Sequence, residues 1–386
     1  MDDKYKALYE ELCALISERA ANTPASVESQ IAVWEDRAPE SLPLLLNVQI
    51  PQEYDLQFPT FNPGEIHNDK DKMLLYGMKH TFSALFADMQ SVPSIRANMG
   101  CGIYPSLFPG ILPLLFDDKM PWIKGHLSSD QVRSLREKDI VLTDEFKLAL
   151  EHMAYIAEHI KDLGVYVYPL DLQGPFDVAH LVLGDQIFYG MYDEPELIHH
   201  LMDLSCYALE LGWTENLKYI PDSDRLITHY NQLVMPRSRG GAKISEDTST
   251  LLSAHHIDEF VTPYTQRILN HTGGGYIHYC GRNDHLFKCV LEMKNAYGIN
   301  FGNPDMHDMD DILQQTTEAG KVYYGDCFRR EDEDLLDYFH RCRKYATSKK
   351  DGKCRLLLTL NSTCDDQYDA IRAWQQAAGK VLLFYS

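Results

Sequence analysis

The sequence is poor in basic residues and has no long apolar run. Its 36 lysines and arginines stand against 57 aspartates and glutamates, which gives a formal net charge of −21. A field of that sign repels the phosphates of nucleic acids and the surfaces of anionic membranes, so we expect neither as a partner. The longest apolar stretch, residues 110–116, is much shorter than the roughly 20 residues that a membrane-spanning helix needs.

The amino-terminal residues lack the features of a secretion signal. The sequence opens with Met1-Asp2-Asp3-Lys4, which is acidic, and no apolar segment follows it. Nine cysteines, an odd number, are spread over 386 residues, so we expect free thiols or metal ligands in place of a disulfide framework. Together these features predict a cytoplasmic protein.

The sequence also lacks internal repeats, low-complexity tracts and long linkers. Its 45% hydrophobic and 24% charged residues are typical of a packed globular protein. A change in composition near residue 90 predicts an amino-terminal extension over residues 1–90 and a second domain over residues 91–386. Within the extension, helical patterns over residues 3–20 and 69–89 flank an irregular stretch that is rich in proline, asparagine and glutamate.

After residue 90, short β-branched and aromatic runs alternate with segments of helical period, which is typical of βα units and a parallel sheet. The pattern predicts an α/β fold, a (β/α)8 TIM barrel with an N-terminal helical extension. The predicted strands are residues 92–98, 164–170, 225–230, 241–245, 275–280, 298–302, 321–325 and 354–360.

Three helices have recognisable features. Asp193-Glu194-Pro195 predicts a helix start, because proline suits the first turn of a helix. Gly379 predicts the end of the last helix, which begins near Asp365. Pro263 predicts a kink or a restart in the helix of residues 255–270.

Active sites of TIM barrels lie at the carboxyl ends of the strands, where His278-Tyr279-Cys280 ends the fifth predicted strand. Residues two apart on a strand face the same side, so the imidazole and the thiol lie together and could hold one metal ion. Nitrogen and sulfur ligands select zinc, and three protein ligands with one open position describe a catalytic site. The third ligand is expected to be Cys364, with Cys327 as the alternative.

The alternative for His278 and Cys280 is a purely structural role, because cysteine is among the most often buried residues. The remaining helical cysteines are expected to pack in the core; these are Cys13, Cys206, Cys289 and Cys342.

Carboxylates and other polar residues stand on or after several predicted strands. Such groups at strand ends are candidates for acid–base and substrate-binding roles, although helix capping is the alternative for Asp247. The candidates are Arg96, Asp171, His229, Glu246, Asp247 and Asp326.

These residues resemble motifs of a known family. The run Asp171-Leu172-Gln173-Gly174-Pro175-Phe176, followed by Asp193-Glu194-Pro195, resembles a segment of the uroporphyrinogen decarboxylase superfamily. Ser245-Glu246-Asp247, Pro263-Tyr264 and His278-Tyr279-Cys280-Gly281 continue the resemblance in the same order and spacing. It covers residues 90–386 and implies a (β/α)8 barrel.

Within that superfamily the sequence is more similar to the cobamide-dependent methyltransferases than to the true decarboxylases. The methyltransferases carry a His-x-Cys and Cys zinc site, and His278, Cys280 and Cys364 stand at the corresponding places. The decarboxylases carry an arginine-rich amino-terminal segment, whereas residues 42–55 contain no arginine here.

The resemblance implies methyl transfer between a corrinoid, such as a methylcobamide on a carrier protein, and a small substrate held beside Zn²⁺. From their positions at strand ends, Glu246 would be a fourth ligand that leaves when the substrate binds, and Asp171 would also belong to the catalytic set. The substrate-binding candidates are Arg96, His229, Asp247 and Asp326.

Two other functions remain alternatives. The first is decarboxylation of a tetrapyrrole, with Asp171 or Asp247 holding pyrrole N–H groups and a cluster of arginines forming a positive cleft. That cluster would be drawn from Arg96, Arg237, Arg239 and Arg282. The second alternative is a non-catalytic module that binds a corrinoid or its carrier protein. Acidic barrels of this size often form homodimers, but the sequence indicates no interface.

Overall fold

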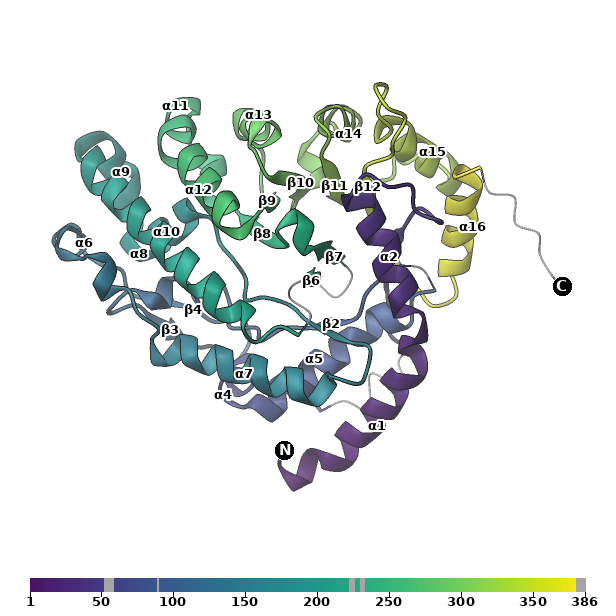
Figure 1. Cartoon of the computed structure of the whole chain (residues 1–386), viewed down its shortest axis with the longest axis horizontal. Coiled ribbons are helices and arrows are strands. Elements are labelled where there is room, and N and C mark those ends of the chain that lie inside the picture. Colours follow the sequence, from purple (N-terminus) through teal and green to yellow (C-terminus); the bar gives the residue numbers. More distant parts are fainter. Residues whose placement is uncertain (52–58, 89, 222–225, 230–232, 380–386) are drawn as a thin grey trace.

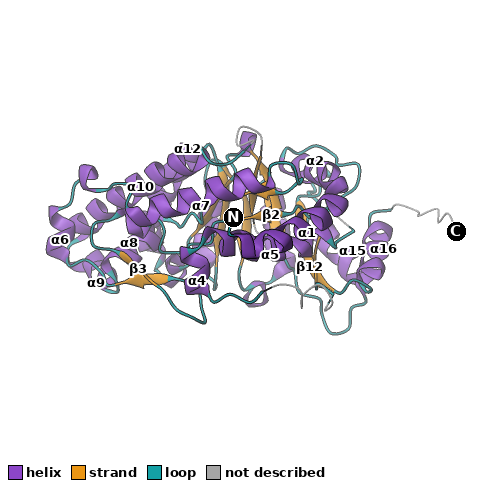
Figure 2. Cartoon of the chain, turned by 90° about the horizontal axis from the view of Figure 1, so that it is seen from below, coloured by secondary structure: helices purple, strands orange, loops and turns teal. Residues whose placement is uncertain are grey.

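The computed structural model describes residues 1–51, 59–88, 90–221, 226–229 and 233–379. Helices lie around the outside of a set of mostly parallel strands (Figure 1), and the view turned by 90° shows the strands between the helices (Figure 2). None of the helices in these ranges is both long and apolar enough to cross a lipid bilayer.

A six-stranded sheet forms the centre of the molecule, and all of its pairings are parallel. Its strands read as nearly continuous apolar runs, because helices or other strands cover both faces. In spatial order the strands are β1 (Leu44–Val48), β12 (Leu356–Ser362), β11 (Val322–Gly325), β10 (Ala296–Phe301), β9 (Gly275–Tyr279) and β8 (Ala242–Ser245).

A second parallel pair, β2 (Ser94–Ile95) and β5 (Tyr166–Val167), extends this arrangement. An isolated parallel bridge between Gln173 and Ser245 links the segment after β5 to β8. On the other side, the Ser91 hydroxyl donates to the backbone oxygen of Leu46 in β1 at 3.0 Å. The fold is therefore a TIM-barrel-like α/β fold, although the strand pairs of the described residues do not form a continuous ring.

The helices confirm most of the expected segments. The predicted helices over residues 3–20 and 69–89 are α1 and α5, and the last helix is α16, with Gly379 in the left-handed region after it. The helices are α1 (Asp3–Arg19), α2 (Thr23–Trp34), α4 (Pro63–Asn68), α5 (Lys70–Leu85), α6 (Ser129–Ser134), α7 (Asp144–Ile160), α8 (Pro175–Leu183), α9 (Gln186–Asp193), α10 (Pro195–Leu217), α11 (Ala254–His256), α12 (Thr262–Thr272), α13 (Asp284–Glu292), α14 (Met309–Glu318), α15 (Leu335–Tyr345) and α16 (Gln367–Ala377).

Two predicted helix boundaries have their own local structure. α10 begins at Pro195, as expected, but Glu194 precedes it as the cap and Asp193 ends α9. The break expected at Pro263 is present as a π-helical turn, Ile257–Val261, in which the Thr262 N–H donates to the Ile257 oxygen. A proline cannot donate to the preceding turn and crowds the carbonyl four residues before it, so the wider turn accommodates Pro263.

The amino-terminal region differs from the expected helical extension. The segment predicted to be irregular contains β1, whose residues Leu44–Val48 pair in parallel with Leu358–Ser362 of β12. Residues 1–90 therefore contribute an edge strand to the central sheet, in addition to the helices that pack on it.

The third predicted strand, residues 225–230, is not a strand of the parallel sheet. Its described part, β6 (Leu226–His229), pairs antiparallel with β7 (Leu233–Pro236) in a hairpin. Buried side chains of β7 pack with Trp34 and Tyr276, near the amino-terminal ends of the central strands. A second antiparallel hairpin, β3 (Leu112–Leu114) with β4 (Trp122–Lys124), lies at the edge of the fold.

Candidate metal centre

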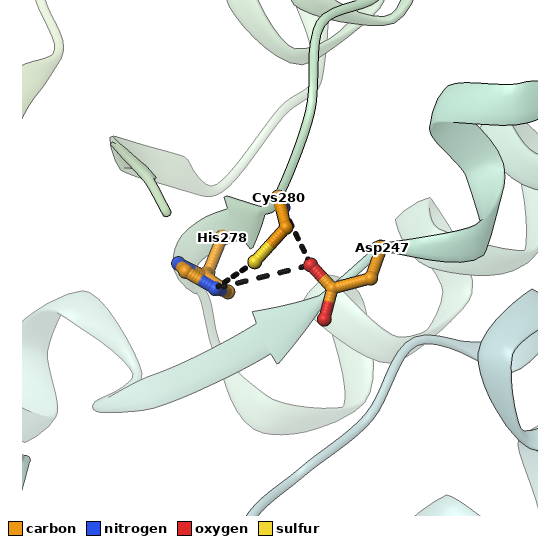
Figure 3. Close-up of side chains that lie close together, drawn as sticks. All are labelled: Asp247, His278 and Cys280. Carbon is orange, nitrogen blue, oxygen red and sulfur yellow. Dashed lines mark hydrogen bonds and ion pairs between the residues drawn. The ribbon is translucent and has the colours of Figure 1, made fainter. Parts of the chain in front are cut away.

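Asp247, His278 and Cys280 come together at the carboxyl ends of β8 and β9 (Figure 3). His278 Nε2 lies 3.8 Å from Cys280 Sγ and 3.9 Å from Asp247 Oδ1. Zinc bonds of about 2.0 Å to nitrogen and 2.3 Å to sulfur, in tetrahedral geometry, place two such ligand atoms about 3.5 Å apart. Small side-chain movements would bring the three donors onto one zinc ion.

The parallel register of β8 and β9 produces this meeting. Ser245 pairs with His278, so the side chains that follow two residues later on each strand, Asp247 and Cys280, reach the same place. The Cys280 N–H donates to Asp247 Oδ1 at 2.6 Å, which ties the two strand ends together. Gly302 leaves room for the thiol, because a Cβ at that position would lie 2.4 Å from Cys280 Sγ.

His278 is held in the orientation that metal binding needs. Its Nδ1 lies 2.5 Å from Asn300 Oδ1, and the Asn300 amide nitrogen donates to the backbone oxygen of Tyr324 at 2.6 Å. The second bond turns the amide oxygen of Asn300 toward His278, so Nδ1 carries the proton. The lone pair of Nε2 therefore points at Cys280 and Asp247.

Burial sets the protonation of the two soft donors. It lowers the pKa of His278, and the nearby Lys243 ammonium lowers it further, so the imidazole is neutral near pH 7. Burial also raises the pKa of Cys280 to about 11, with Asp247 adding to the effect. The thiol keeps its proton near neutral pH and gives it up only to a strong partner such as a metal ion.

A cavity of about 550 Å³ opens beside His278. Asp326, a predicted substrate-binding residue, lines this cavity and accepts from the backbone N–H of Phe328 at 3.1 Å and from the Tyr338 hydroxyl at 3.4 Å. Among the lining residues are His278, Asn300, Tyr324, Asp326 and Thr359.

The predicted residues Arg96 and Asp171 form an ion pair of 2.5 Å. Arg96 also lies over the ring of Tyr168 and lines a separate cavity of about 200 Å³. Asp171 and the buried Lys243 influence each other: burial lowers the pKa of Lys243, and the Asp171 carboxylate counteracts that shift. A group of charges therefore lies inside the strands, next to the metal candidates.

Glu246 does not lie with the trio, although we expected it to be a metal ligand. Alternate residues of a strand point to opposite sides, so its side chain turns away from that of Asp247 into the helix layer. There it accepts from the hydroxyls of Ser249 at 2.7 Å and Thr265 at 2.5 Å. Gly174 makes the space, since a Cβ there would lie 2.3 Å from the Glu246 carboxyl group.

A second buried carboxyl group, Asp177 in α8, supports the loop that carries Asp247. It accepts from the backbone N–H groups of Asp247 at 2.9 Å and Thr248 at 2.8 Å. Burial raises the pKa of Asp177 to about 7 and that of Glu246 to about 8. Through these hydrogen bonds the two carboxyl groups hold the end of β8 in place.

The two candidates for the third thiolate differ in position. Cys364 follows β12 and is half-buried, and its thiol donates to the backbone oxygen of Gln49 at 3.5 Å. It is not part of the group whose ligand atoms lie within 4.8 Å of one another. Cys327 is buried in the core, where its pKa is raised well above the usual value by burial and by Cys342. The structure thus places Asp247, and neither cysteine, beside His278 and Cys280.

The other predicted residues lie elsewhere. His229 ends β6 in the hairpin, away from the carboxyl ends of β8 and β9, and its side chain falls outside the described part of the structure. Arg237 and Arg239 precede β8 and donate to backbone oxygens near its amino-terminal end. Arg282 is exposed and pairs with Asp284 at 2.9 Å. The arginines proposed to form one positive cleft are therefore dispersed.

Three residues of the site were not predicted. Asn300 and Lys243 are polar residues within otherwise apolar strands, and that contrast was a usable signal for both. Asp177 follows the Gly-Pro-Phe run of residues 174–176, where its buried position depends on the packing of α8 against β8.

Comparisons with known proteins bear on the fold. No protein-family model and no curated protein sequence matches this chain. Among solved structures, a methyltransferase from Methanosarcina mazei is similar, with a TM-score of 0.61 and 10% sequence identity. The match covers 91% of this chain and 98% of the other. At that identity the similarity concerns the fold alone.

Proposed function

We propose that this protein is a methyltransferase that moves a methyl group between a corrinoid on a partner protein and a small substrate bound beside zinc. The observation that carries the proposal is the meeting of His278, Cys280 and Asp247, of which His278 lines a cavity of about 550 Å³. The structural neighbour from Methanosarcina mazei is named a methyltransferase, which agrees in general terms with this activity.

The donor set fits zinc better than a hard cation. A neutral imidazole and a thiol are soft or borderline ligands, and Mg²⁺ or Ca²⁺ would prefer oxygen alone. When bound, zinc would lower the pKa of a substrate thiol and so supply a thiolate nucleophile near neutral pH. The corrinoid and its carrier protein belong to the proposal on the resemblance of the sequence motifs.

The side chains around the donors have separate tasks in this proposal. Asn300 keeps the Nε2 lone pair of His278 available, and the Cys280 N–H orients Asp247. Asp326, which lines the cavity together with His278, would orient the substrate. The third protein ligand is Asp247 as the side chains lie here, or Cys364 if the segment after β12 moves toward the cavity.

Zinc content tests the site. We expect the variant Cys280→Ser to contain one zinc equivalent less per chain than the wild type, measured by plasma emission spectrometry on protein purified without a metal-affinity tag. Cys13→Ser, a half-buried cysteine of α1, serves as the matched control and should keep the wild-type content. Loss of zinc in Cys364→Ser would identify that thiol as the third ligand, and loss in Asp247→Asn would identify the carboxylate. Unchanged zinc in Cys280→Ser would contradict the site.

Spectroscopy with methylcobalamin and a panel of thiols tests the reaction. We expect the methylcobalamin spectrum to change with turnover in the wild type, and the rate to fall at least about 100-fold in Cys280→Ser, as is typical when a group essential to nucleophile activation is removed. A spectral change without turnover would indicate a binding module instead. Conversion of uroporphyrinogen to a less carboxylated product would support the decarboxylase alternative.

A further inference from the structure

A second cluster of possible metal ligands lies outside the cavity, between α13 and the π-helical turn before α12. It consists of Asp258, His285 and Cys289, whose ligand atoms all lie within 4.8 Å of one another. His285 Nε2 lies 2.7 Å from Asp258 Oδ1, and Cys289 Sγ lies 3.6 Å from the same oxygen. These atoms belong to no part of the site described above.

The local backbone explains why the three side chains meet. His285 and Cys289 are four residues apart on α13, so they lie on one face of the helix, one turn apart. Asp258 belongs to the π-helical turn Ile257–Val261, which precedes Pro263. Widened turns of this kind are frequent at functional sites, and this one presents the carboxylate toward α13.

The distances suit a zinc ion. With bonds of about 2.3 Å to sulfur and 2.1 Å to oxygen, tetrahedral geometry places a thiolate and a carboxylate oxygen about 3.6 Å apart, as observed for Cys289 and Asp258. The imidazole and the carboxylate need to separate by only about 0.6 Å to reach their tetrahedral spacing of about 3.3 Å. Asp258 can make that movement, because its side chain is 59% exposed.

We propose that Asp258, His285 and Cys289 form a second zinc site, with water as the fourth ligand, that fastens the π-helical turn to α13. Imidazole, thiolate and carboxylate together favour zinc over Mg²⁺ or Ca²⁺. The side chains of His285 and Asp258 are partly exposed to solvent, so a water molecule can complete the tetrahedron.

The position of the cluster gives this zinc ion a structural role. α13 begins at Asp284, four residues after Cys280, and Asn283 caps it. The Asn283 amide also donates to the backbone oxygens of Thr250 and Leu252, in the segment after β8. A metal ion on α13 would therefore stiffen the loop that carries Cys280 and its contacts with the end of β8.

The test uses the full chain, depleted of metal with a chelator and then loaded with Co²⁺ or Zn²⁺ alone. We expect Cys289→Ser and Asp258→Asn each to bind one equivalent less than the wild type, and the thiolate-to-cobalt absorption to fall in Cys289→Ser. Loss of a second equivalent is expected when Cys280→Ser is combined with Cys289→Ser. Added Zn²⁺ should raise the thermal midpoint of Cys280→Ser but raise that of the double variant less, because only a bound ion stabilises the fold by mass action.

Matched controls separate metal binding from misfolding. Glu259→Gln changes the neighbouring carboxylate of the same turn, which pairs with His199 and His255, and should leave metal binding unchanged. Wild-type metal binding by a folded Cys289→Ser and a folded Asp258→Asn would overturn the second site. If Cys289→Ser loses one equivalent while Cys280→Ser loses none, the second site stands and the proposed active-site metal fails.

Discussion

The amide of Asn300 decides which nitrogen of His278 faces the other two donors. Its own nitrogen is committed to the Tyr324 oxygen, so its oxygen is available only as an acceptor for His278 Nδ1–H. A histidine whose second nitrogen is bonded in this way is a stronger and better oriented ligand. In the proposed site, metal affinity would therefore depend on a residue that does not touch the metal.

We predict that Asn300→Ala lowers zinc affinity by about 10-fold to 100-fold, the range typical of lost outer-sphere partners of a histidine ligand. Competition with a chromophoric chelator measures the change, in a Cys289→Ser background so that only one site contributes. Asn270→Ala, at an exposed asparagine of α12, is the control and should have no effect. Equal affinities in the two variants would mean that Asn300 does not orient His278.

The pKa of Cys280 predicts how that affinity depends on pH. His278 has a lowered pKa and is already neutral at pH 7, whereas Cys280, with a pKa of about 11, must lose a proton to bind. One proton is released per metal ion, so the apparent Kd for zinc should fall about tenfold for each pH unit between pH 7 and 9. Titrations at three pH values, again in Cys289→Ser, check this. An affinity that is independent of pH would exclude the Cys280 thiol as the source of the proton.

At the scale of single residues, the sequence predicted that His278 and Cys280 lie together, but it did not predict which residues surround them. The His-x-Cys spacing on a strand correctly placed His278 and Cys280 on one side, because strand alternation is a local property. The expected third partner, Cys364, depends on how the segment after β12 packs, and in the structure Asp247 lies there in its place. The zinc ion itself remains a prediction.

The segment directly after β8 places neighbouring side chains in two different layers of the fold. Asp247 lies with His278 and Cys280, while Glu246, the residue before it, is buried between Gly174, Ser249 and Thr265. Burial, and the nearby Asp177, raise the pKa of Glu246 from 4.5 to about 8. The folded protein therefore favours the protonated carboxyl group near neutral pH.

This shift predicts a pH-dependent stability. As the pH rises above 4.5, the unfolded chain releases the Glu246 proton, but the folded chain holds it up to about pH 8. Rising pH therefore favours the unfolded chain, by up to about 1.4 kcal/mol per pH unit in that window. We expect Glu246→Gln, which carries no charge, to become more stable relative to the wild type as the pH increases from 5 to 8.

Urea denaturation at pH 5, 6, 7 and 8 measures the difference. Glu137→Gln, at an exposed residue, serves as the matched control and should follow the wild type at every pH. A constant difference between Glu246→Gln and the wild type would show that Glu246 titrates alike in the folded and unfolded chains.

Most strands were predictable because their β-branched and aromatic runs are bounded by glycine or polar residues. Neither the parallel edge strand β1 nor the antiparallel pairing of β6 was predicted. β1 is a short leucine run between Pro43 and Pro51, in a segment whose composition favours irregular structure. β6 resembles any other strand in sequence, and its antiparallel partner β7 is what separates it from the parallel sheet. The available sign in the sequence was the lack of a helical pattern between the predicted strands of residues 225–230 and 241–245.

At the scale of the whole molecule, the amino-terminal segment is joined to the centre of the fold. β1 forms one edge of the six-stranded sheet, and α2 lies against the β6–β7 hairpin near the amino-terminal strand ends (Figure 1). Residues on both sides of the composition change near residue 90 therefore contribute strands to the central sheet. Trp34, the last residue of α2, packs against both the hairpin and the central sheet.

We predict that Trp34→Ala lowers the free energy of unfolding by about 3–5 kcal/mol, the usual range for removing a buried large aromatic side chain. The indole is 3% exposed, its ring stacks on Tyr276 with centroids 6.3 Å apart, and its N–H donates to the Val234 oxygen at 2.7 Å. The substitution therefore removes apolar contacts with β9 and leaves a buried backbone oxygen of β7 without its donor.

Trp122→Ala provides the matched control, because Trp122 lies on β4 and is 51% exposed. That variant should change the free energy of unfolding by no more than about 0.5 kcal/mol, as is usual for surface positions. Urea denaturation followed by circular dichroism measures both variants. If the amino-terminal segment packed only loosely on the sheet, Trp34→Ala would be as mild as Trp122→Ala, or would produce a separate early transition. A single cooperative transition shifted to much lower urea would instead show that α2, the hairpin and the parallel sheet unfold together.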